Sequence, residues 1–273
     1  MRIKGIPLKV HPSWFAVLLL FTWTSQEQVM KVSAGQLSVG TSWLIGLITA
    51  LLLFLSVLLH ELGHSLVALR EGVKVKSITL FFLGGVAQIE KECRNPMGSL
   101  RVAMAGPLVS ILIAIVLLKS VSLFSESNIL LSNLFSQLGS LNLVLALFNL
   151  LPGLPLDGGV ILKSMVWKFT GSQKKGIEVA TDSGRFLSLL AIGLGFFIAL
   201  RGGGLGGFWL IVLGWFGFAA SRSQKQILSL QIALTKLNVN KVSSKRFRVL
   251  EGDQSLKKLS MLRLSSKDES PYS

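Results

Sequence analysis

SWLIGLITALLLFLSVLLHELGH, residues 42–64, is an uncharged apolar run that ends in a cluster of titratable side chains. Its first 18 residues, 42–59, are long enough to predict a helix that crosses a lipid bilayer. The HELGH segment from His60 to His64 follows directly. Two histidines and a glutamate at the end of such a span are costly to desolvate, so this segment is a candidate functional site.

Further apolar runs extend this pattern along the chain, which has 273 residues, 51% of them hydrophobic. Only 15% are charged, against about 25% in soluble domains. The runs predict an all-α integral membrane protein, a bundle of about six transmembrane helices. No small-residue cleavage site follows the first run, so it is not expected to be a signal peptide. The predicted spans are residues 12–24, 42–59, 102–118, 130–151, 186–200 and 205–220.

The net charge of +15 is distributed unevenly over the predicted loops. If all six runs cross, 25 of the 28 Lys and Arg lie on one side, and only Lys31, Lys119 and Arg201 lie on the other. This bias predicts a cell-membrane protein with both termini in the cytoplasm. The first run is short for a crossing, and a re-entrant run there would move the N-terminus across. The charge is therefore interpreted as a topology signal and not as a nucleic-acid-binding surface.

The segments outside the spans predict one small folded element and one tail. Residues 73–83 alternate and are rich in β-branched and aromatic side chains, and residues 86–89 follow Gly84 and Gly85. This pattern predicts a strand pair in the cytoplasmic loop after the second span, with the two glycines as its turn. Residues 1–222 are expected to form the membrane domain and residues 223–273 a basic cytoplasmic tail. The glycine-rich segments 158–164 and 201–207 do not match a phosphate-binding loop.

The HELGH motif predicts a metal site. The chain has 3 histidines in 273 residues, and chance would produce His-Glu-x-x-His on the order of 0.001 times in such a chain. On a helix, His60 and His64 lie on one face, one above the other. Two imidazoles at this spacing can bind one Zn²⁺ per chain, and Glu61 beside the first ligand can reach a water molecule there. The single cysteine, Cys93, excludes a site built from several cysteines.

A catalytic zinc takes three protein ligands, so a third must come from another segment. Asp157 is the favoured candidate, because it follows two helix-breaking prolines at membrane depth, where a carboxylate is by default a candidate for function. The alternative for Asp157 is a helix-cap or turn residue at the cytoplasmic surface. His11 lies near the predicted cytoplasmic edge, but a residue before proline more often marks a turn. Glu178 is the third alternative, and it lies in a basic loop.

HELGH on a membrane helix, followed by FNLLPGLPLDGG at residues 148–159, resembles the site-2 protease family of intramembrane metallopeptidases. The resemblance covers residues 6–220, and GPLVS at 106–110 also matches a small-residue motif of that family. It implies that His60, His64 and Asp157 bind zinc and that Glu61 is catalytic. The expected activity is the cleavage of transmembrane segments of membrane proteins.

Other features carry weaker expectations. Asn149 is a candidate to donate a hydrogen bond to the substrate backbone, with helix-to-helix contact as an equal alternative. Gly106 and Ser110 are expected to serve close helix packing. The six-span branch of the family often carries a C-terminal CBS domain pair, and residues 242–264 resemble the opening of such a module. The identity of the substrate, a regulatory membrane partner and a homo-oligomer stay open.

A different class of protein also fits a membrane metal site. A metal transporter or a non-proteolytic chaperone would keep the ligands but has no need of a general base. The intact Glu61 therefore favours a hydrolase.

Overall fold

The computed structural model describes residues 2–3, 5–81, 84–90, 93–124 and 128–235. Met1–Leu228 form one compact unit, and Ser229–Ser273 form a second unit that lies largely outside the described residues. Residues 242–264, which resemble the opening of a CBS module, also lie outside them. The boundary predicted after residue 222 stays a prediction.

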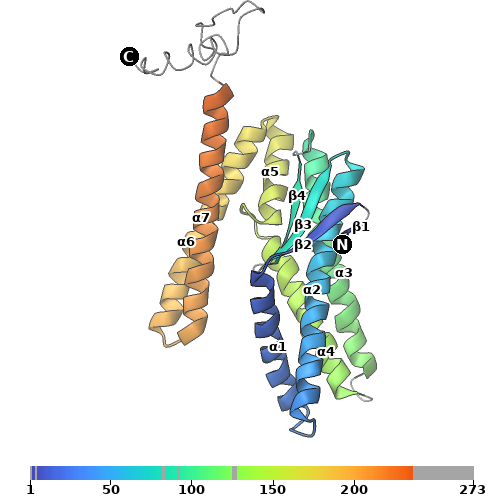
Figure 1. Ribbon diagram of the computed structural model, residues 1–273. Helices are drawn as coiled ribbons and strands as arrows, with labels where there is room; N and C mark the ends of the chain where they lie inside the picture. Colours follow the sequence, from blue (N-terminus) through green and yellow to red (C-terminus); the bar gives the residue numbers. More distant parts are fainter. Residues whose placement is uncertain (1, 4, 82–83, 91–92, 125–127, 236–273) are drawn as a thin grey trace, which may run out of the picture. The chain divides into compact units, whose positions relative to one another are not determined.

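Helices make up most of the first unit, as the hydropathy predicts (Figure 1). In the described residues they are α1 (Ser13–Val32), α2 (Val39–Arg70), α3 (Pro96–Phe124), α4 (Ile129–Asn149), α5 (Asp157–Thr170), α6 (Gln173–Leu200) and α7 (Gly204–Thr235). Five of them, α2, α3, α4, α6 and α7, are long and apolar enough to cross a membrane. The chain is thus a multi-pass membrane protein with an α-helical fold.

The helices extend beyond the predicted spans, and α5 was not expected. Helix α2 continues through the HELGH motif to Arg70, so the motif lies inside the helix. Helix α6 begins at Gln173 and not at residue 186. The prediction missed its first half because charged side chains there lower the local hydropathy. Lysines interrupt the apolar pattern of α5 in the same way. Hydropathy identifies the apolar part of a helix and misses the part that carries charged side chains.

The β element is larger than the predicted strand pair. The sheet has the order β1–β2–β3–β4, with β1 (Arg2–Ile3), β2 (Ile6–Val10), β3 (Val75–Phe81) and β4 (Gly84–Ile89). Strand β2 runs parallel to β3, and β4 runs antiparallel to β3. The N-terminal strands were missed because this short basic segment has no alternating pattern of its own. Strand β1 pairs with β2, and β2 pairs with β3, about 70 positions away.

The prediction that Gly84 and Gly85 form the turn between the strands is wrong. The register pairs Phe81 with Gly84 and Leu80 with Gly85, so both glycines belong to β4. The reason for a glycine at position 85 is steric and lies in the functional site. A Cβ there would overlap the side chain of Glu61 on α2.

Small residues let the helices around α2 approach one another closely. Gly46 of α2 lies against the backbone of α1, where a Cβ would come within 2.6 Å of Thr22 O and 3.0 Å of Gln26 N. Gly63 lies against α3 in the same way, since a Cβ there would come within 3.0 Å of Ala105 O. Such small-residue contacts are the usual basis of helix association in membranes, where no hydrophobic force drives helices together. They fix α2 between α1 and α3.

We expect the Gly46→Val variant to be less stable than the wild type by about 1–3 kcal/mol, because the added side chain separates α1 from α2. Unfolding in detergent micelles measures the change. Gly40→Val on the same helix is the control, since a Cβ at Gly40 has only Ser38 Oγ at 4.0 Å. Equal stability of the two variants would contradict the packing role of Gly46.

Candidate metal centre

Three predicted ligands from two distant segments meet in the interior of the bundle. His60 and His64 lie one turn apart on α2 and are 3% and 7% exposed. Asp157 is the first residue of α5. The two Nε2 atoms are 3.2 Å apart, and each lies 3.2 Å from Asp157 Oδ2. The three atoms therefore form an equilateral triangle.

This triangle has the dimensions of a zinc site. Tetrahedral zinc binds nitrogen and oxygen at about 2.0–2.1 Å, which places neighbouring ligand atoms about 3.3 Å apart. The observed separations of 3.2 Å match this value. Two imidazoles and one carboxylate are also a donor set that zinc prefers in catalytic sites. The residues therefore fit zinc as a set of three ligands.

Hydrogen bonds on the far side of each ring direct both Nε2 atoms toward the centre of the triangle. His64 Nδ1 lies 2.7 Å from the carbonyl oxygen of Val102, so Nδ1 carries the proton and donates it. His60 Nδ1 lies 2.9 Å from Ser110 Oγ. Partners of this kind fix the ring orientation and the tautomer of metal-binding histidines. Both come from α3.

Gly106 provides the space that the two rings need. A Cβ at this position would overlap His64 Nε2 and come within 2.7 Å of His60 Nε2. Close helix packing was favoured over a catalytic role for Gly106 and Ser110, and the structure brings both of them against the histidines. Two sequence signals concerned them: the family resemblance of GPLVS at 106–110, and a spacing of four residues that places both on one face of α3.

A compact irregular segment, residues 150–156, leads directly to Asp157 at the start of α5. The backbone of this segment passes directly over the first turn of the helix. A Cβ at Gly158 would overlap Leu150 O, and one at Gly159 would overlap Leu154 N. The two glycines after Asp157 therefore allow a close approach of backbone to backbone that no larger residue permits.

Glu61 lies beside the triangle but is not part of it. The group of side chains with mutually close ligand atoms contains His60, His64 and Asp157 only, among the described residues. Glu61 interacts electrostatically with all three. Its Oε2 accepts a hydrogen bond from the backbone N–H of Ala87 at 3.2 Å. Strand β4 therefore positions this carboxylate, a role that no sequence signal indicated.

Comparison with known proteins places this geometry in a family. The family described as peptidase family M50 matches residues 48–130 and 121–191, a range that includes the HELGH motif and Asp157. The chain belongs to peptidase family M50.

Individual relatives agree with this assignment to M50. The protein sll0528 of Synechocystis sp. is 50% identical over 212 residues, which cover 78% of this chain and 55% of the relative. The zinc metalloprotease MJ0392 of Methanocaldococcus jannaschii is 39% identical over 191 residues, 70% of this chain and 51% of the relative. The chain thus spans just over half the length of these curated relatives.

A solved M50 structure has the same fold. The site-2 protease from Methanocaldococcus jannaschii superposes with a TM-score of 0.55 at 29% identity, covering 92% of this chain and 98% of that one. The resemblance to the site-2 protease family that the motifs indicated is therefore confirmed.

The other candidate residues of this M50 chain lie outside the triangle. Asn149 is the half-buried last residue of α4, and its side chain has no hydrogen-bond partner among the described residues. His11 is exposed, with its Nδ1 2.8 Å from Ser13 Oγ. Glu178 lies 3.9 Å from Lys174 on α6, and both side chains are about half exposed. The alternative third ligands therefore stay at the surface.

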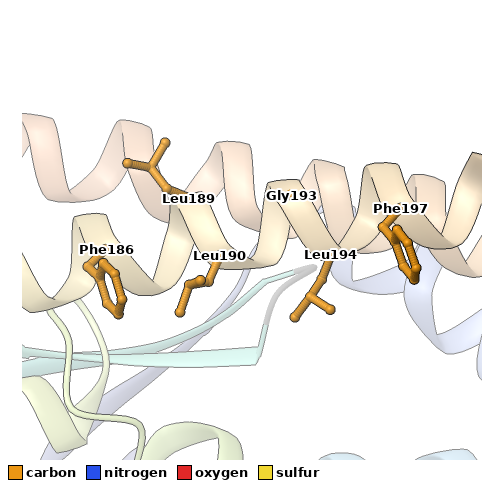
Figure 2. Close-up of a pocket in the computed structure, with 6 residues that line it drawn as sticks. All are labelled: Phe186, Leu189, Leu190, Gly193, Leu194 and Phe197. Atoms are coloured by element: carbon orange, nitrogen blue, oxygen red, sulfur yellow. The ribbon is translucent and has the colours of Figure 1, made fainter.

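A depression on α6 is no rival site for chemistry in this M50 chain. Its lining is apolar throughout and contains no titratable side chain (Figure 2). It is formed by Phe186, Leu189, Leu190, Gly193, Leu194 and Phe197. Such a face on a membrane-spanning helix is suited to contact with lipid tails.

We expect Ser110→Ala to weaken zinc binding about 10- to 100-fold, because His60 loses the partner that fixes its ring. Competition with a chromogenic chelator on the purified protein measures the dissociation constant. Ser120→Ala on the same helix is the matched control, since its hydroxyl bonds only to Val116 O. Unchanged zinc affinity in Ser110→Ala would contradict the positioning role.

Proposed function

We propose that this M50 chain is an intramembrane zinc metalloprotease that cleaves transmembrane segments of membrane proteins. The observation that carries the proposal is the triangle of His60, His64 and Asp157 with the carboxylate of Glu61 beside it. Three ligands leave one position for water, which is the arrangement of catalytic zinc sites and not of closed structural ones.

In this proposal the chain's own groups handle the proton. Zinc, when bound, supplies a Lewis acid that polarises a carbonyl group and activates water near neutral pH. Glu61 takes the proton from the attacking water as general base and returns it to the leaving amine as general acid. The Ala87 N–H keeps the Glu61 carboxylate in place beside the ligands during both steps.

The depth of the site supports a substrate inside the membrane. His64 lies six residues before Arg70, the last residue of α2, a distance of about 9 Å along a helix. A substrate helix has all its backbone groups internally bonded and must unwind before attack. Strand β4 is the edge of the sheet in the described residues. An unwound substrate segment can pair with β4, and Asn149 is a further candidate donor to its backbone.

The sheet supports the N-terminal part of the predicted topology, in which both termini lie in the cytoplasm. Strand β2 precedes α1, and its partner β3 follows α2. Two strands that pair lie on the same side of the membrane, so if α2 crosses, α1 must also cross. Helix α1 has 20 residues, about 30 Å in length, which matches the thickness of the hydrocarbon core. The basic loops then face the cytoplasm.

A purified enzyme and a model substrate with a single transmembrane span test the proposal. We expect Glu61→Gln to bind one zinc per chain and to lose at least about 10³-fold in cleavage rate, because the proton acceptor is gone. Asp157→Ala should lose both zinc and activity, because one of three ligands is removed.

Glu178→Ala is the control for the third ligand, and it should retain zinc and activity. Metal analysis and gel-based cleavage measure the two quantities separately. Full cleavage by Glu61→Gln would overturn the role of Glu61 as the general base, and the absence of cleavage by the zinc-loaded wild type would overturn the protease assignment. A Glu61→Gln protein that still moved zinc across vesicles, without any cleavage by the wild type, would support the transporter instead.

We expect Gly85→Val to lower the cleavage rate strongly and to leave zinc binding intact, because a Cβ at position 85 overlaps the side chain of Glu61 and the three atoms nearest to it all belong to Glu61. Gly193→Val on α6 is the control, since a Cβ at Gly193 meets nothing within 4 Å. Cleavage assays and metal analysis on both variants check the prediction. Loss of zinc in Gly85→Val would show that β4 supports the ligands and not Glu61 alone.

A further inference from the structure

The irregular segment before Asp157 is fixed through the backbone of one residue, Leu154. Its N–H donates to the carbonyl oxygen of Ala180 on α6 at 3.1 Å. Its carbonyl oxygen accepts a hydrogen bond from Ser221 Oγ on α7 at 2.8 Å. Both backbone groups of this buried residue are therefore satisfied by helices that carry no metal ligand.

The contact between this segment and the two helices has no spare room. Ser221 is fully buried, at 0% exposed. A Cβ at Gly184 of α6 would overlap Leu154 O and lie 2.9 Å from Ser221 Oγ. Ser183 of α6 donates a further hydrogen bond to the carbonyl oxygen of Pro152. A glycine and two serines thus let α6 and α7 approach the segment at backbone distance.

The link from Leu154 to Asp157 is short and internally bonded. The N–H of Leu156 donates to Gly153 O, and the N–H groups of Gly159 and Val160 donate to Leu156 O. On its other side the segment packs against the first turn of α5 through Gly159. A shift of Leu154 therefore moves the start of α5, and Asp157 is the first residue of that helix.

We propose that Ser221 and Gly184 are positioning residues for the third metal ligand. They fix the Leu154 backbone, and through it they hold the Asp157 carboxylate against His60 and His64. The inference rests on the proposed zinc centre and extends it to α7, which lies beyond the residues 48–191 that match the family. A ligand set tolerates errors of only about 0.5 Å, so a small shift of the segment is sufficient to weaken the metal site.

Zinc affinity of the purified full chain tests the proposal, with two matched pairs of variants. Ser221→Ala is compared with Ser188→Ala, which removes a buried hydroxyl of α6 that bonds to Gly184 O and forms no hydrogen bond with the segment among the described residues. Gly184→Ala is compared with Gly193→Ala on the same helix, where a Cβ meets nothing within 4 Å. Ser221→Ala and Gly184→Ala should bind zinc about tenfold or more weakly, and both controls should match the wild type.

The visible absorption of the Co²⁺-substituted protein is the second readout, because it reports the coordination of the metal and is insensitive to a loss of stability alone. We expect the Co²⁺ bands to weaken or shift in Ser221→Ala and to stay unchanged in Ser188→Ala. If Gly184→Ala does not fold, the serine pair decides the question.

Wild-type zinc affinity and an unchanged Co²⁺ spectrum in Ser221→Ala would overturn the inference, whatever its cleavage rate. Asp157→Ala separates this failure from a failure of the zinc centre itself. If Asp157→Ala loses zinc while Ser221→Ala keeps it, the centre stands and the positioning role is wrong. If Asp157→Ala keeps zinc, the centre is wrong and the inference falls with it.

Discussion

Two imidazoles and a carboxylate that face one another in an apolar bundle are the constraint on which the rest of this structure depends. Polar and charged groups removed from water cost several kcal/mol unless they are paired or bind a metal. The ligand atoms are 3.2 Å from one another, so a cation between them would satisfy all three at once. Packing of the same helices through apolar side chains would not require two imidazoles and a carboxylate at this position.

The residues around the triangle have two separate roles: some orient the histidine rings, and others leave space for the rings and for the segment before Asp157. Orientation comes from α3, where the Val102 carbonyl and the Ser110 hydroxyl bond to the Nδ1 atoms of His64 and His60. Space comes from glycines, since Gly106 makes room for the rings and Gly158 and Gly159 make room for the segment before Asp157. Small residues in this protein therefore serve the chemistry as well as the packing of helices.

Adjacent residues of α2 depend on different neighbours. His60 is oriented by α3, whereas Glu61 is held by the backbone of β4. The metal set and the proposed base can therefore be disturbed independently, which is why zinc content and cleavage rate are informative as separate measurements. The sheet also joins the segments before α1 and after α2, so the element that holds Glu61 is the one that closes this helical hairpin.

The sequence by itself determined the features that depend on neighbouring residues. Apolar run length predicted the membrane helices, and the four-residue spacing of His60 and His64 predicted one helix face, because helix geometry relates such positions locally. Asp157 could be singled out because a carboxylate among helix breakers at membrane depth is rare.

Only the tertiary structure decided which residues far apart in the sequence contact one another. It showed that β2 pairs with β3, that Gly85 accommodates Glu61 and that Ser110 bonds to His60. It also joined Ser221 to Leu154, 67 residues away. These contacts have no local pattern in the chain, since they arise from backbone groups and small side chains whose partners are set by the way the helices pack.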